Sequence, residues 1–290
     1  MFIFLFLALF TTASAQFDRT ALLVNVPTAD VLPRGSLAVT ALLTQPLFTT
    51  PRNPDREGGG AVRFSPLGRL ELALTAYTPQ DWVLGASYQV LGGMRRRTGT
   101  LQLRDTLAIE GVEEAAGIAT GPSLAVGIHD VGIHAYVSPI GNGPDDAWPD
   151  WKYGEYRPWP TVRQPENFSA FVVGTLPLGT FARVHLGLGR GRYVGYDRGR
   201  FLNTDIFLDE THWWAVSLFG GIELLLGPYA RAGVEADGRD VNAGLRVDAG
   251  QFNISVAVTK LEGFTPTLTK DRFGRVALAF GYQFNNLLPR

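Results

Sequence analysis

Charged residues stand at alternating positions in three consecutive segments of the C-terminal third of this 290-residue chain. They are Glu223, Arg231 and Arg246. If these segments are β-strands with tight turns near Gly227 and Gly238, their register sets Glu223 beside Arg231, and Arg231 beside Arg246, about 5 Å apart on one face. The three charges would form a band in a pore that selects a charged solute or polymer, or they would pair to stabilise a lumen wall. The sequence favours the structural pairing.

A second candidate site is the segment 140–167, which is rich in aromatic residues, carboxylates and proline. Aromatic rings can stack on sugar C–H faces while carboxylates accept hydrogen bonds from hydroxyl groups, so the segment could contact carbohydrate. Aromatic side chains also anchor proteins at a membrane interface, and proline stiffens loops. The residue types favour this anchoring role. The candidate carbohydrate contacts are Trp148, Trp151, Tyr153, Tyr156 and Trp159.

The remaining residues form no recognisable catalytic or metal site. Histidines 129, 134, 185 and 212 lack the spacing of metal ligands. Only His185 stands at an inward position of a predicted strand, and no Ser or Asp is placed beside it, so we expect a non-enzymatic protein without a metal or cofactor. The chain has 26 Lys plus Arg against 27 Asp plus Glu, which does not indicate nucleic-acid binding. It has no cysteine, so a disulfide framework and a lipidated cysteine are both excluded.

The elements that would position the candidate residues are strands with period-two alternation. In the clearest one, from Arg275 to Phe284, large apolar residues alternate with mostly small or polar ones, which puts the two sets on opposite faces. Segments 69–78, 81–91, 240–248 and 251–260 repeat the pattern. The faces opposite the apolar ones are small or charged, as expected for a wet lumen rather than a dry core.

We therefore predict an all-β fold, a transmembrane antiparallel β-barrel of about 14 strands, with 12 as the alternative, because bacterial barrels have even strand numbers. The strand at 99–108 is the least well supported, since Asp105 would share the face of Leu101 and Leu103. If this strand is absent, a second strand must also be absent to keep the number even. Alternation alone also fits a soluble sandwich, but short turns on one side and long connections on the other favour a barrel. The predicted short turns are 65–68, 129–132, 177–180 and 227–228, and the long connections are 46–59, 140–167, 191–212 and 261–273. The predicted strands are 36–45, 60–66, 69–78, 81–91, 99–108, 120–129, 132–139, 168–176, 181–190, 213–225, 229–237, 240–248, 251–260 and 274–284.

The N-terminus indicates export. An apolar run from Met1 to Phe10 leads into Ala13-Ser14-Ala15, the pattern of a cleavable secretory signal, and the run is shorter than the roughly 20 residues that span a bilayer. We expect residues 1–15 to be a signal peptide, 16–35 an N-terminal periplasmic or plug segment, 36–284 the barrel and 285–290 a C-terminal tail. The expected location is the bacterial outer membrane, with lipid as a partner.

Three parts of the chain resemble YjbH-type outer-membrane proteins, which are linked to exopolysaccharide and capsule export. They are Asn25–Leu37, Gly121–Gly132, and Phe219–Glu223 followed by Ala232–Gly238 and Val241–Arg246. The resemblance implies a barrel that serves exopolysaccharide biosynthesis or export across the outer membrane, with polysaccharide and export-machinery proteins as partners. Full-length members are much longer and many are lipoproteins, so the chain would be a shorter, single-barrel, non-lipidated relative. The alternatives are a porin-like channel for small solutes and a structural or assembly barrel with a plugged lumen.

Overall fold

The computed structural model describes residues 26–46, 57–78, 81–92, 121–134, 169–194, 205–207, 216–227, 229–238, 240–259, 261, 275–285 and 287–288. In this part of the chain the elements are β-strands, apart from the three-residue 3-10 helix η2 (Gly191–Tyr193). None of the described helices is long and apolar enough to cross a membrane. The predicted signal peptide 1–15, residues 16–25 and the predicted strand 99–108 lie outside the described residues.

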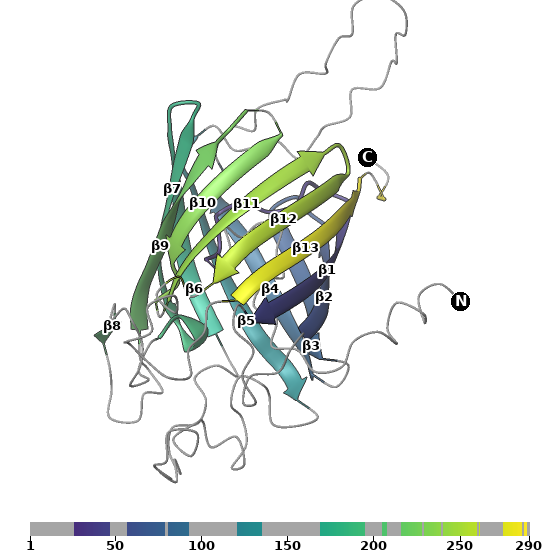
Figure 1. Cartoon of the computed structure of the whole chain (residues 1–290), viewed down its shortest axis with the longest axis horizontal. Coiled ribbons are helices and arrows are strands. Elements are labelled where there is room, and N and C mark those ends of the chain that lie inside the picture. Colours follow the sequence, from purple (N-terminus) through teal and green to yellow (C-terminus); the bar gives the residue numbers. More distant parts are fainter. Residues whose placement is uncertain are drawn as a thin grey trace, which may run out of the picture.

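Twelve strands form one closed antiparallel barrel (Figure 1). Closure is made by β1 (Ser36–Pro46) and β13 (Arg275–Phe284), which pair from Leu37 with Phe284 to Pro46 with Arg275. A closed wall leaves no unpaired sheet edge in lipid. The short β8 (Asp205–Phe207) pairs with one end of β9 and adds no strand to the ring, since β7 pairs directly with β9. The other strands follow in chain order: β2 (Glu57–Ser65), β3 (Leu70–Thr78), β4 (Asp81–Leu91), β5 (Ser123–His134), β6 (Ser169–Leu178), β7 (Ala182–Arg190), β9 (Val216–Leu225), β10 (Ala230–Ala236), β11 (Val241–Ala249) and β12 (Phe252–Thr259).

The count of fourteen strands is therefore wrong, and the alternative of twelve is confirmed. The predicted turn at residues 129–132 does not exist, because β5 runs without a break from Ser123 to His134. His129 and Asp130 stand opposite the single residue Gly85 of β4, so a β-bulge occupies the place of the turn. In addition, β4 pairs directly with β5, which leaves no place in the ring for a strand at 99–108.

The outer face of the barrel carries large apolar side chains. Along β13 the predicted alternation is confirmed: Phe280 points outward and is 46% exposed, whereas its inward neighbour Ala279 is buried. Leu84 of β4 and Ile222 of β9 are more than half exposed in the same way. An apolar face of this extent on a closed wall fits contact with lipid rather than with water.

Two rims of different construction follow from the strand order. At one, the tight-turn rim, short connections join β2 to β3, β6 to β7, β9 to β10 and β11 to β12, with glycines at positive φ in these turns. The opposite rim, the long-loop rim, receives the long connections after β1, β5, β7 and β12. Two features break the predicted asymmetry. Residues 92–122 join β4 to β5 at the tight-turn rim, and the short connections β3–β4 and β10–β11 lie at the long-loop rim.

Inward glycines make room for aromatic rings on one part of the wall. Gly127 faces Phe171 across the β5–β6 pair, and Gly187 faces Phe219 across the β7–β9 pair. A Cβ atom on either glycine would lie 2.3 Å from the ring of its partner. Tyr193 of η2 packs on Phe219 with ring centroids 4.5 Å apart. The glycine-rich sequence at residues 187–191 thus permits close packing in the sheet, as expected for glycines of this kind.

Candidate lumen site

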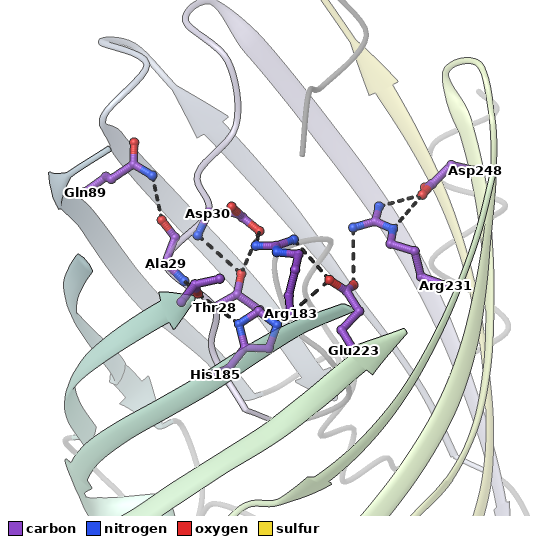
Figure 2. A network of polar contacts seen from close by, with 10 residues as sticks. Thr28, Ala29, Asp30, Gln89, Arg183, His185, Glu223, Arg231 and Asp248 are labelled. Carbon is purple, nitrogen blue, oxygen red and sulfur yellow. Dashed lines mark hydrogen bonds and ion pairs between the residues drawn. The ribbon is translucent and has the colours of Figure 1, made fainter. Parts of the chain in front are cut away.

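The N-terminal segment (Val26–Leu32) lies inside the barrel and is hydrogen-bonded to inward side chains of the wall (Figure 2). All its residues except Asp30 are buried. Backbone groups left unpaired away from water would be costly, and the wall supplies partners for several of them. The bonds run from Val26 N to Glu235 Oε2 (3.0 Å), from Ala29 N to Thr175 Oγ1 (3.0 Å), from Leu32 N to Glu71 Oε2 (3.0 Å) and from Gln89 Nε2 to Ala29 O (2.7 Å).

The N-terminal segment runs lengthwise through the barrel. Val26 is bonded to Glu235, which stands near the long-loop end of β10, and Leu32 is bonded to Glu71, near the tight-turn end of β3. The chain then enters β1 at Ser36, at the tight-turn rim. The bonding strands β3, β4, β6 and β10 are spread around the ring, so the segment crosses the lumen rather than lining one side of it.

An ion pair links the N-terminal segment to the wall. Arg183 of β7 is almost fully buried and donates from Nη1 to Glu223 Oε2 of β9 at 3.0 Å. Its Nη2 contacts the carboxylate of Asp30 in the N-terminal segment. Figure 2 shows the guanidinium held between the two carboxylates. Charge-assisted hydrogen bonds of this kind are stronger than neutral ones, so Arg183 is a strong polar link between segment and wall.

The ion pairs continue along the neighbouring strands. Glu223 Oε1 also lies 3.5 Å from Nη1 of Arg231 on β10. Arg231 donates from Nη2 to Asp248 Oδ2 of β11 at 2.5 Å, and Arg246 donates from Nε to Asp248 Oδ1 at 2.7 Å. Glu223 and Asp248 are thereby each shared between two arginines.

The structure brings together the predicted charge band of Glu223, Arg231 and Arg246. Arg231 and Arg246 are register partners, and Glu223 stands diagonally across from Arg231. The network also includes residues that sequence reasoning missed. Arg183 and Asp248 each lie in a predicted strand at an inward position, so the alternation could have identified them. Asp30 lies before the first strand, where no periodic pattern applies.

His185 has a hydroxyl neighbour that the sequence did not reveal. Its Nδ1 lies 2.9 Å from Oγ1 of Thr175, its register partner on β6, and its Nε2 lies 3.9 Å from Glu223 Oε2. Thr175 Oγ1 also accepts the N–H of Ala29, and both side chains are buried. In this position the pair helps to hold the N-terminal segment.

A second polar cluster holds the long-loop end of the N-terminal segment. Asn242 Nδ2 of β11 donates to Glu235 Oε1 and to Asp237 Oδ2, both at 3.0 Å. Glu235 uses its other oxygen to accept the N–H of Val26. The amide of Asn242 therefore orients the carboxylate that binds the segment.

Other predicted site residues lie outside the part of the chain that the structure describes. The carbohydrate-contact candidates Trp148, Trp151, Tyr153, Tyr156 and Trp159 lie in a segment outside the described residues, as does His212. Among the residues that the structure describes, no group of three or more His, Asp or Glu side chains is arranged to hold a metal ion.

Comparisons with known proteins find likeness in structure only. No protein-family model matches the chain, and no curated protein matches its sequence. The COG4313 outer membrane channel from Pseudomonas putida F1 is similar at 10% identity and a TM-score of 0.38, over 88% of this chain and 98% of that one. The Ralstonia pickettii toluene transporter TbuX has 10% identity and a TM-score of 0.36, over 87% and 90%. A mutant porin of Rh. blastica has 13% identity and a TM-score of 0.30, over 78% and 55%.

Proposed function

We propose that this protein is a non-enzymatic outer-membrane channel that serves exopolysaccharide export, and that its N-terminal segment closes the lumen in the conformation described here. One observation carries the proposal: a closed barrel with an apolar outer face surrounds a polar, charged lumen that a single chain segment crosses lengthwise. A passage for a hydrophilic molecule needs a polar lining, and a passage that is not always open needs a part that can leave.

The resemblance to YjbH-type proteins supports the polysaccharide cargo. Two of its three parts, the first and the third, lie far apart in sequence yet meet in the lumen: Val26 is bonded to Glu235, and Glu235 is bonded to Asn242. Asp30 and Glu223, from two of the parts, contact the same arginine, Arg183. The resemblance therefore covers the N-terminal segment and one of the wall residues that bind it directly, Glu235.

A structural or assembly barrel with a filled lumen is the second candidate. The buried bonds between the N-terminal segment and the wall favour it, because each adds to the stability of the closed state. A further buried apolar cluster joins Val83 of β4 to Leu42 of β1 and Ala257 of β12, although β4 pairs with neither strand. Side chains thus also meet across the inside of the barrel.

A reversible crosslink of the N-terminal segment to the wall separates these candidates. Thr175 Oγ1 lies 3.0 Å from Ala29 N, so the crosslink is built as Ala29→Cys/Thr175→Cys in a chain without native cysteine, and its formation is checked by non-reducing gel mobility. In planar bilayers we expect the oxidised protein to be silent and the reduced protein to conduct. Each single variant, treated with the same oxidant, should show the same conductance before and after reduction. A reduced protein that never conducts would favour the structural barrel.

Cargo is tested in cells. A deletion strain complemented with Trp148→Ala/Trp151→Ala/Trp159→Ala should secrete less polysaccharide, while outer-membrane fractionation and heat-modifiable gel mobility show unchanged amounts of barrel. Intact export with a normal barrel would exclude the loop as a cargo contact. Loss of the barrel itself would identify the three tryptophans as membrane-interface anchors. Export that persists with the oxidised crosslink, while small-solute uptake stops, would indicate a porin-like channel instead.

A further inference from the structure

Arg183 receives only part of its counter-charge from the barrel wall. Within the described wall its ion-pair partner is Glu223, and Glu223 is shared with Arg231. The remaining partner, Asp30, belongs to the N-terminal segment. Removal of the N-terminal segment would therefore leave the Arg183 guanidinium facing the lumen without one of its two carboxylate partners, and able to bind another anion.

The Nε–Nη2 edge of the Arg183 guanidinium has the geometry of a carboxylate-binding site. Glu223 occupies Nη1, and Asp30 contacts Nη2. The adjacent Nε is buried and has no hydrogen-bond partner in the described part of the protein, and the same holds for Nε2 of the neighbouring His185. Because Nε and Nη2 of arginine carry N–H groups that point in the same direction, they match the two oxygens of one carboxylate. Asp30 uses half of this fork.

We propose that Arg183, assisted by His185, is an anion-binding site of the lumen that Asp30 fills while the N-terminal segment is in place. When the segment leaves, the site binds a carboxylate of an acidic, uronic-acid-containing polysaccharide. Binding is non-covalent: the sugar carboxylate replaces that of Asp30 and gains the second N–H of the fork. The choice of polymer rests on the proposed export function, whereas the site itself rests on the contacts of Arg183.

The test measures binding of short oligogalacturonates to the full chain in detergent micelles. Asp30→Asn removes the competing carboxylate, so it should bind these oligomers about tenfold more tightly than the unaltered protein. Asp30→Asn/Arg183→Lys keeps the charge beside Glu223 but removes the planar fork, and it should lose about tenfold of that affinity. Neutral maltooligosaccharides of equal length should bind none of the variants more tightly.

Asp30→Asn/Arg63→Lys is the matched control. Arg63 is likewise an inward, buried arginine, and it pairs with Glu71 at 3.3 Å rather than with Asp30. This variant should bind oligogalacturonate as Asp30→Asn does. Equal losses for the Arg63 and Arg183 variants would overturn the proposal in favour of general electrostatic attraction. Equal binding of neutral oligomers, or no gain in Asp30→Asn, would overturn it as well.

The crosslinked protein gives a measurement that needs no arginine variant. Oxidised Ala29→Cys/Thr175→Cys holds the N-terminal segment, and with it Asp30, near Arg183, so it should bind oligogalacturonate about tenfold more weakly than the same protein after reduction. Equal binding by the two would contradict the site. Monogalacturonate as a competitor shows whether a free carboxylate suffices or a polymer is required. If the protein binds oligogalacturonate but does not conduct, the anion site is supported and the channel function is contradicted. If the protein conducts but does not bind oligogalacturonate, the channel function is supported and the anion site is contradicted.

Discussion

The outer and inner faces of this barrel follow different rules. The outer face is alike around the ring, with large apolar side chains such as Leu84, Ile222 and Phe280. The inner face changes with position: charged on β7, β9, β10 and β11, whereas the buried residues of β12 and β13 are small and uncharged, such as Asn253, Ala257 and Ala279. The outer face is surrounded by the same apolar environment at every strand, so large apolar residues suffice all around the ring. The inner face is specified by pairwise contacts, so each side chain depends on its partner.

Removing an inner charge should have the largest effect. Arg183→Met leaves Glu223 and Asp30 without their shared cation, and loss of one partner of a buried pair costs about 3–5 kcal/mol. The free energy of unfolding from urea titrations in lipid vesicles measures the loss. Arg183→Met/Glu223→Gln should cost less than the sum of the two single variants, because the double variant no longer leaves the Glu223 carboxylate without one of its two arginines. If the losses in the free energy of unfolding are strictly additive, the contribution of each inner side chain does not depend on its partner.

A charge on the outer face should cost somewhat less, and its cost should depend only on depth. Phe280→Arg, in the middle of β13, should lower the free energy of unfolding by about 2–4 kcal/mol if it lies near the bilayer midplane. Gln283→Arg, on the inward face of the same strand, is the matched control and should cost less. The opposite order in refolding titrations would show that the two faces have been assigned the wrong way round.

Added volume on the inner face should have the smallest of the three effects. Gly187→Ala would place a Cβ atom 2.3 Å from the ring of Phe219 and 2.5 Å from the backbone oxygen of Val172, and overpacking of this kind costs about 1–3 kcal/mol. Gly174→Ala is the control, because the nearest atoms to its added Cβ are 3.8 Å away. The two are compared by thermal unfolding with heat-modifiable gel mobility. Equal stability of both variants would mean that the wall yields easily at Phe219.

The sequence predicted the fold more completely than it predicted the strand count. Alternation is local, so the facing of Phe280 and Ala279 could be read without knowing any strand partner. The error arose at Asp130, because a charged residue two positions before Gly132 resembles a turn. Only the pairing with β4 shows a bulge there, because a bulge is defined by two residues opposing one on the neighbouring strand.

The amino-acid sequence by itself determined that this chain forms alternating strands with an apolar and a polar face, and that Glu223, Arg231 and Arg246 share the polar one. Tertiary structure alone decided what fills the lumen. Asp30 and Arg183 are separated by 153 residues and meet only because the ring closes around the N-terminal segment. No local pattern encodes such a contact. Side-chain direction follows from neighbouring backbone geometry, whereas an ion pair across the lumen depends on the position of every strand between its partners.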